Sequence, residues 1–174
     1  MNQSIIISFI GDDRPGVVEQ LARTVRQYNG NWLESRLAQM AGKFAGIVRV
    51  TAPTDKIDEL KTALAALKAQ GLTAFVENTH ADNTPPKTVR VLNVGILGSD
   101  RPGIIMEVSQ ALAQRGINVR ELKSDVTSAP MSGEPLFEAN AIIEVPTPAD
   151  TTELKQTLDK IADVLCIDIW LEET

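Results

Sequence analysis

Two stretches of the chain, one at its start and one past its middle, carry the same pattern of apolar and polar positions. Residues 4–10 (SIIISFI) and 89–97 (VRVLNVGIL) are apolar and rich in β-branched side chains, which predicts strands. Apolar residues then recur at steps of three and four, as in a helix that rests one face on a sheet. In the first stretch these are Val18, Leu21, Val25 and Tyr28, and in the second Ile105, Val108 and Leu112.

The same elements follow each of these helical patterns. Gly30 and Gly116 are expected to end the helices in a left-handed conformation. Two strands come next, at 32–40 and 43–51 in the first stretch and at 119–127 and 136–145 in the second, closed by Pro53 and Pro146. A second helix is predicted from Ile57, Leu60, Leu64 and Leu67, and its counterpart from Leu154, Leu158 and Ile161, with Asp150 and Glu153 as a capping box. Final strands cover 72–78 and 166–172.

The two stretches are copies of one unit. A shift of 87 residues places Asp13-Arg14-Pro15-Gly16 on Asp100-Arg101-Pro102-Gly103, and it also places Asn31 on Asn118. Further along, the shift grows to 93, so the second copy carries an insertion, for which 128–135 is the candidate. A unit of about 80 residues that occurs twice predicts two similar domains.

The order of elements in each copy predicts the fold class. Strand, helix, strand, strand, helix, strand is the order of the ferredoxin-like split βαβ arrangement, an α+β fold. Each copy is expected to form a four-stranded antiparallel sheet with two helices on one face. We expect domains at 1–80 and 87–174, with a stiff, polar linker at 81–86 that contains Pro85 and Pro86.

Charge and composition exclude several classes of function. The net charge is −6 and lysine and arginine form no stripe, which disfavours direct binding of nucleic acid. The first residues, MNQSIIISFIG, have neither a basic region nor an apolar run long enough for a signal sequence or a membrane span. We therefore expect a cytoplasmic protein with no membrane partner.

Few side chains are suited to metal binding or catalysis. Cys166 is the only cysteine and His80 the only histidine, so a zinc site of cysteine and histidine cannot form, and no cofactor is expected. Cys166 is predicted in an apolar strand, as core, and His80 in the polar segment 79–88 that joins the two domains. We expect no catalytic residue, no metal site and no enzymatic activity.

The repeated loop offers a chemistry of its own. In GDDRPG (11–16) and GSDRPG (98–103) a strand ends and a helix begins, where backbone N–H groups lack intrahelical acceptors. Proline suits the first helical turn, aspartate can cap the helix, and glycine lets a ligand approach the backbone. Such a helix start favours an anion such as a carboxylate.

The two repeated asparagines could bind the ammonium group of a ligand whose carboxylate is bound by the helix start. Asn31 and Asn118 begin the next strand, and their side-chain oxygens suit an ammonium group. We expect loop and asparagine to lie at one end of the sheet and to converge on an amino acid, within one unit or across a pair of units. The alternative is that Asp-Arg-Pro-Gly is only a well-built helix cap and turn, which duplication would copy just as readily.

These motifs resemble those of the ACT-domain family of ligand-binding regulatory modules. The resemblance covers nearly the whole chain, as two tandem copies, and is carried by GDDRPGVVEQLARTV, NGNWLESRLAQMAGKFAG and GSDRPGIIMEVSQALAQRGINV. It implies a small amino acid as ligand, with glycine expected, bound at an interface between ACT units in a homo-oligomer. The residues to which it assigns ligand binding are Asp12, Asp13, Arg14, Pro15, Gly16, Asn31, Ser99, Asp100, Arg101, Pro102, Gly103 and Asn118.

Two ACT units with nothing else attached imply a particular role. They resemble transcriptional repressors of the glycine cleavage system, which act through a DNA-binding regulator protein rather than by holding DNA. Two alternatives stay open, a structural pairing module and a regulatory subunit of an amino-acid metabolic enzyme without a ligand of its own. An RNA-recognition domain has the same element order, but an aromatic content of 4% leaves few rings on which bases could stack.

Overall fold

The chain folds into two compact units. The computed structural model describes residues 1–79, 88–130, 132–147 and 149–173. Contacts divide it into unit 1, Met1–Asn83, and unit 2, Thr84–Thr174. The expected linker at 81–86 and His80 lie outside the described residues, so the predicted domain bounds remain predictions.

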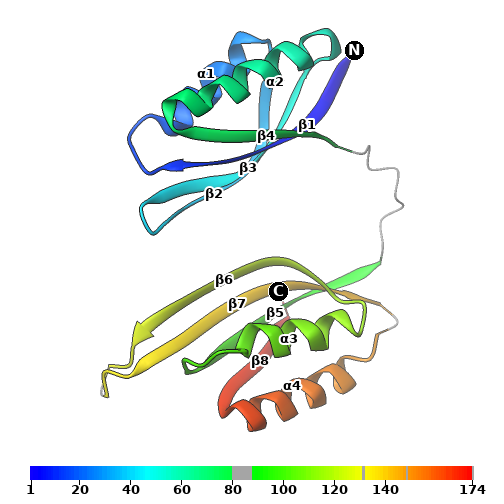
Figure 1. Ribbon diagram of the computed structural model, residues 1–174. Helices are drawn as coiled ribbons and strands as arrows, with labels where there is room; N and C mark the ends of the chain where they lie inside the picture. The colour runs from blue at the N-terminus through cyan, green and yellow to red at the C-terminus, as the bar shows by residue number, and fades with distance from the viewer. Residues whose placement is uncertain (80–87, 131, 148, 174) are drawn as a thin grey trace. The chain divides into compact units, whose positions relative to one another are not determined.

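Unit 1 is a four-stranded antiparallel sheet with two helices (Figure 1). The spatial order of its strands is β2-β3-β1-β4. Its elements are β1 (Asn2–Asp12), α1 (Val17–Gln27), β2 (Asn31–Met40), β3 (Lys43–Pro53), α2 (Ile57–Ala66) and β4 (Leu72–Asn78), with 3₁₀ turns at Thr54–Lys56 and Leu67–Gln70.

Unit 2 repeats this order as β6-β7-β5-β8, which confirms the predicted α+β fold of two ferredoxin-like units. Its β6–β7 hairpin is longer than the β2–β3 hairpin, at the position predicted for the insertion. The elements are β5 (Val89–Ser99), α3 (Ile104–Ala113), β6 (Asn118–Ser128), β7 (Pro135–Pro146), α4 (Thr151–Leu165) and β8 (Ile167–Glu173).

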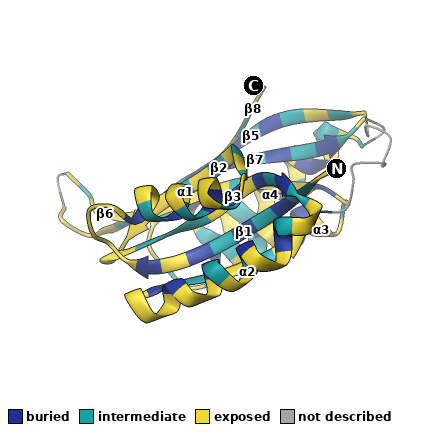
Figure 2. Ribbon diagram, turned by 90° about the horizontal axis from the view of Figure 1, so that it is seen from above, coloured by how far each residue is buried: buried dark blue, intermediate teal, exposed yellow. Residues whose placement is uncertain are grey.

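Each unit has its own hydrophobic core between the helices and one face of the sheet. In unit 1 alternate residues of β1 point into it, so Ile5, Ile7 and Phe9 are buried. Leu60 and Leu64 of α2 meet them and are fully buried (Figure 2). The period of two in the strands and of three to four in the helices therefore explains which residues form the core.

The first buried residue of the helical stripe lies one position earlier than predicted in both units, whereas Leu21, Val25, Val108 and Leu112 are buried as predicted. Val18 is 43% exposed, and Val17 is the buried residue that packs with Leu21 and Val25. In unit 2 the buried residue is likewise Ile104 instead of Ile105. Because each pair consists of two adjacent apolar residues, spacing alone could not tell them apart.

The ends of the first helices differ between the units. Gly116 has a φ of 65°, as predicted, but in unit 1 Asn29 takes the left-handed conformation with a φ of 58°. Gly30 is needed for space, because a Cβ there would lie 2.7 Å from Cγ1 of Val25 and 2.8 Å from its carbonyl oxygen. Asparagine tolerates this conformation better than most residues.

Helix α4 begins at the predicted cap and ends at the cysteine. The Asp150 carboxylate accepts a hydrogen bond of 2.7 Å from the backbone N–H of Thr152, whereas Glu153 lies 3.7 Å from Arg115. Cys166 has a φ of 51° and is exposed, so its prediction as core is wrong. It occupies the position at which unit 1 has Gly71, the residue that precedes the last strand.

The Asp150 cap should make the stability of unit 2 depend on acid pH. The Thr152 N–H lowers the pKa of Asp150, so the cap stabilises fully above the unfolded value of about 3.9 and is lost as pH falls through the folded pKa. Asp150→Asn should keep the cap and lose this part of the pH dependence, because asparagine caps without titrating. Thermal unfolding from pH 7 to pH 2.5 tests this prediction, and parallel curves for parent and variant would contradict it.

Candidate functional site

The loop between β1 and α1 is held against the β2–β3 hairpin. The backbone N–H of Asp13 donates a hydrogen bond of 2.9 Å to the carbonyl of Gly42. One residue earlier, Lys43 donates to the Asp12 carboxylate at 2.5 Å, which lowers the pKa of Asp12. The loop is therefore fixed at the hairpin end of the sheet.

The helix begins later than the sequence pattern predicts. Its N-cap residue is Gly16, with a φ of 92°, and no side chain caps it. Pro15 consequently lies in the turn before the helix, and the predicted cap by Asp13 is wrong. Unit 2 repeats this arrangement, with Gly103 as N-cap at a φ of 103°, so the same correction applies to Asp100 and Pro102.

The bare helix start leaves backbone donors available. The first helical hydrogen bond runs from the Gln20 N–H to the Gly16 carbonyl at 2.8 Å, so α-helix geometry provides no acceptor for the N–H groups of residues 17–19. A Cβ built on Gly16 or on Gly103 would meet no atom within 4 Å. Open space therefore lies beside the glycine, next to donors that suit a carboxylate.

A shallow groove of about 530 Å³ adjoins this helix start. We call it the loop groove. The residues along it are Asp13, Arg14, Gly16, Val17, Val18, Glu19, Ala22 and Phe44. The Phe44 ring also contacts Phe9, with 5.9 Å between the ring centroids. The loop groove thus combines the Asp13 carboxylate and the backbone donors of the helix start with apolar side chains such as Val18 and Phe44.

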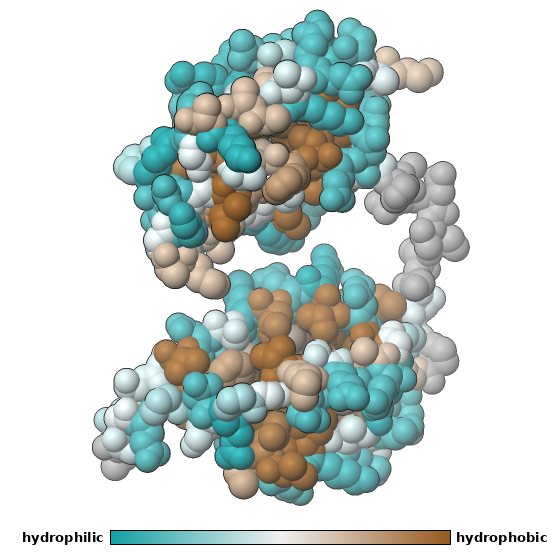
Figure 3. All heavy atoms as spheres, in the orientation of Figure 1, coloured by the Kyte–Doolittle hydropathy of each residue, from teal (hydrophilic) through white to brown (hydrophobic). Residues whose placement is uncertain are grey.

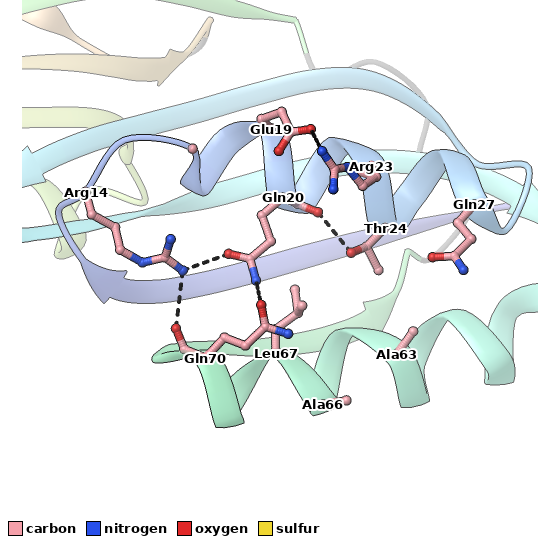
Figure 4. A pocket seen from close by; sticks show the side chains of 11 residues that line it. Arg14, Glu19, Gln20, Arg23, Thr24, Gln27, Ala63, Ala66, Leu67 and Gln70 are labelled. Carbon is pink, nitrogen blue, oxygen red and sulfur yellow. Dashed lines mark hydrogen bonds and ion pairs between the residues drawn. The ribbon is translucent and has the colours of Figure 1, made fainter.

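Arg14 reaches the other side of α1, into a polar groove of about 540 Å³ between α1 and α2 (Figure 4). Its guanidinium donates to the Gln20 side chain at 2.8 Å and to the carbonyl of Gln70 at 3.2 Å. The Gln20 amide in turn donates to the Gln70 side chain at 2.5 Å. Arg14 therefore ties the loop to the end of the second helix through uncharged acceptors.

The loop of unit 2 has the same backbone but different flanks. The Asp100 N–H donates to the Pro135 carbonyl at 3.0 Å, as Asp13 does to Gly42. Ser99 replaces Asp12, and its neighbour across the sheet is Leu136, so the ion pair of unit 1 has no counterpart at this position. The residues of this loop assigned to ligand binding are Ser99, Asp100, Arg101, Pro102 and Gly103.

The two asparagines lie at the opposite end of the sheet from the loops. Asn31 pairs with Thr51, which pairs with Ser4, eight residues before Asp12 along β1. At about 3.4 Å per residue this separation is ~27 Å, far more than an amino acid spans. The expected convergence within one unit is therefore wrong, because β2 runs parallel to β1 and begins where β1 begins.

The same register holds in unit 2. Asn118 pairs with Glu144, which pairs with Val91, eight residues before Ser99. Its side-chain amide donates to the Glu144 carboxylate at 3.2 Å. Only convergence across a pair of units remains for either asparagine.

The sequence analysis missed several residues around the loops. Gln20 and Gln70 hold Arg14, and Lys43 holds Asp12. Phe44, which recurs as Phe137 in the repeat, is half-buried and forms part of the loop groove. The repeat was the available signal for Phe44, whereas Lys43 required the strand register.

Alanine at Gly16 should destabilise unit 1 without any steric clash. The cost is that of a left-handed Cβ, about 1 to 2 kcal/mol, since the space around the position is open. Gly16→Asn is the matched control and should cost less, because asparagine visits this region more readily. Urea unfolding of the three proteins tests the prediction, and an equal loss for both variants would contradict it.

The described residues form neither a metal-binding cluster nor a membrane-spanning helix. The described segments contain no group of three or more histidine, cysteine, aspartate or glutamate side chains placed to hold a metal ion. Within the same residues, no helix has the length and apolar character required to cross a membrane.

Comparison with known proteins identifies the domain. Residues 3–77 match the family model of the ACT domain. The glycine cleavage system transcriptional repressor of Escherichia coli strain K12 is 24% identical over 162 residues, covering 92% of this chain and 85% of the repressor, and that of Shigella flexneri matches equally.

Two solved structures share the fold over the whole chain. A protein of Galdieria sulphuraria superimposes with a TM-score of 0.84 and 28% identity, over 100% of this chain and 99% of that one. A structure assigned as a glycine cleavage system transcriptional repressor has a TM-score of 0.73 and 22% identity, over 100% and 98%. Residues 3–77 therefore match the ACT domain, unit 2 repeats the same strand order, and the chain as a whole resembles the glycine cleavage system transcriptional repressor.

Proposed function

We propose that this protein is an amino-acid-sensing transcriptional repressor of the glycine cleavage system type, which acts through a DNA-binding partner protein. The observation that carries the proposal is the open helix start beside Gly16, repeated at Gly103. The similarity to repressors of that name supports the regulatory role, and it favours a cytoplasmic regulator over an enzyme.

The ligand chemistry follows from the loop groove. A free amino acid has a carboxylate, which the N–H groups of residues 17–19 can bind, and an ammonium group, which suits the Asp13 carboxylate. The wall at Val18 and Phe44 lies close to this mouth, which favours a small side chain. Glycine is accordingly the ligand that we expect, with serine next.

For the asparagine half of the site, the pair of units that we propose comes from two copies of the chain. β2 is an edge strand, with backbone groups free to pair with another strand. If two copies pair their β2 strands antiparallel, Asn31 of one copy faces the Met40 end of the other. That end carries Gly42, the residue to which the loop is bound. A two-fold dimer therefore completes two equivalent sites.

Thermal unfolding with a panel of free amino acids tests the function. At a hundredfold excess over the dissociation constant, a ligand adds about 2.7 kcal/mol, a shift of several degrees for a chain of this size. We expect glycine or serine to raise the midpoint and nucleotides to leave it unchanged. Asp13→Ala together with Asp100→Ala should abolish the shift, whereas Asp55→Ala with Asp159→Ala, remote from the loops, should keep it.

The absence of any shift at millimolar concentrations would contradict amino-acid sensing by the isolated chain. A structural pairing module, or a regulatory subunit without a ligand of its own, would then be favoured. A shift that survives in the Asp13 and Asp100 variants would show that the ligand binds elsewhere.

A further inference from the structure

The acidic charge of the chain is concentrated in unit 2. Residues 1–83 contain nine acidic and nine basic side chains, whereas residues 84–174 contain fourteen acidic and eight basic ones. Unit 1 is therefore neutral, and unit 2 carries the whole net charge of −6. Because the two units share one fold, this imbalance does not come from the architecture.

Most of the excess lies on one face of one sheet. In β7 the residues 137, 139, 141, 143 and 145 are buried beneath the helices, so Glu138 and Glu144 belong to the opposite face. Strand register adds residues of β6 and β8 to that face. Six acidic residues occupy it, and we call it the acidic face: Glu121, Asp125, Glu138, Glu144, Asp168 and Glu172.

Only one basic side chain falls at the register positions of this face in the described strands of unit 2. It is Lys123, whose Nζ lies 3.0 Å from the Glu121 carboxylate. Counted at the paired positions, the acidic face carries a charge of −5, and Arg120 lies at the bulge of β6, between paired positions. A basic partner would therefore meet several carboxylates at once.

The equivalent face of unit 1 is balanced. Strand register places three acidic and three basic residues on it, and two of the acidic residues form ion pairs. Glu34 lies 3.5 Å from both Arg36 and Arg49, and Lys43 pairs with Asp12. A face of this fold can thus neutralise its own charges, and the acidic face does not.

An aromatic side chain lies within the acidic face. Trp170 of β8 pairs with Gly95 of β5, and a Cβ on Gly95 would lie 2.1 Å from Cε2 of the indole. The ring therefore rests on the glycine, which fixes its position, while 41% of the residue stays exposed. Apolar residues reach the surface in both units (Figure 3). Trp170 is a large exposed apolar residue that lies between Asp168 and Glu172 on the acidic face. Tryptophan is among the residues that contribute most to protein interfaces.

We propose that the acidic face of unit 2 docks on a lysine- and arginine-rich surface of a protein. Charge complementarity selects this occupant, since opposite charges steer association and like charges oppose it. A second copy would bring −5 against −5, and nucleic acid or anionic lipid would also be repelled. The indole of Trp170 is the apolar anchor at the centre of the contact.

The identity of the partner rests on the proposed function, in which the protein acts through a DNA-binding regulator. A DNA-binding regulator must carry a cationic surface to contact phosphates, and that surface has the chemistry that the acidic face accepts. Docking there would compete with DNA, so repression would act by occupying the partner's DNA-binding surface. The amino-acid site lies on separate residues, the loops and the asparagines.

Titration with a synthetic twelve-residue peptide of alternating lysine and arginine tests the proposal at 0.15 M salt. In the Trp32→Phe variant Trp170 is the only tryptophan, so its fluorescence reports contact with the acidic face. Glu138→Lys with Asp168→Lys should weaken binding at least about tenfold, given the size of exposed ion-pair effects. The matched control, Asp159→Lys with Asp163→Lys on α4, changes the net charge equally and should weaken it less than about threefold.

Three results would overturn the proposal. Equal weakening by both double variants would show that the peptide follows net charge alone. No binding by the parent, or no change in Trp170 fluorescence, would show that the acidic face does not accept a cationic surface. Sedimentation in which Glu138→Lys with Asp168→Lys abolishes self-association would assign the face to a second copy.

The amino-acid panel on the same variants separates this inference from the proposed function. The thermal shift should persist in Glu138→Lys with Asp168→Lys, because neither residue belongs to the loops. Loss of peptide binding with an intact shift supports the acidic face independently of sensing. If the peptide binds through the acidic face but no amino acid raises the unfolding midpoint, the docking surface is supported and amino-acid sensing is contradicted.

Discussion

Replacing Leu60 with alanine should lower the free energy of unfolding of unit 1 by about 3 kcal/mol and leave unit 2 unchanged. Leu60 is fully buried in the core of unit 1, and removing a buried leucine side chain costs its transfer energy together with that of the cavity left behind. The effect is confined because the buried residues form two separate clusters, one in each unit. A loss of this size is a large share of a small domain's stability.

Each unit contains a tryptophan that reports on its own unfolding. Trp32 packs against the core of unit 1, and Trp170 lies on β8 of unit 2. Urea titration of single-tryptophan variants, Trp170→Phe and Trp32→Phe, therefore follows one unit at a time. Leu154→Ala is the matched change in α4 and should shift the Trp170 transition alone. Equal shifts at both reporters would show that the units unfold as one.

The fold could be predicted because its information is local and occurs twice. Strand alternation, such as that of Ile5, Ile7 and Phe9, and the helical spacing of Leu60 and Leu64 are properties of neighbouring residues. The repeat then tested each assignment against a second copy. The order of strands and helices could then be read along the chain, and this order predicts the split βαβ arrangement that the sheet topology confirms.

The start of the helices shows the limit of that information. In both units two adjacent apolar residues fit the helical spacing equally well, and in unit 1 Val17 is the buried one while Val18 is exposed. The repeat could not reveal the error, because Ile104 and Ile105 present the same ambiguity. The displaced Val18 then becomes part of the loop groove, so a one-residue error in the core was also an error in the site.

The asparagines show a different limit, set by strand direction. Asn31 and the loop at Asp13 are eighteen residues apart in sequence, and α1 returns the chain to the end of the sheet where β1 began. A strand that follows such a crossover starts far from the loop, whatever its residues are. The sequence motif is repeated faithfully, but only the register shows that its two halves require different units.

Mixing two inactive variants should restore amino-acid binding if copies complete each other's sites. In an Asp100→Ala background, which removes the second loop, Asp13→Ala and Asn31→Ala should each abolish binding when alone. In a dimer of one chain of each kind, one site contains both defects and the other contains neither, because a two-fold interface uses each patch twice. Random exchange makes half of the dimers mixed, so about one quarter of the parental sites return.

Calorimetric titration of the refolded mixture with the amino acid of largest thermal shift counts these sites. The distance of ~27 Å along β1 means that a single unit cannot produce this rescue, since the ligand would have to reach both Asp13 and Asn31. No recovery, from variants that each fail alone and still dimerise, would contradict the pairing of β2 edges. Full binding by Asn31→Ala alone would remove Asn31 from the site, and the loop groove would then be the whole of it.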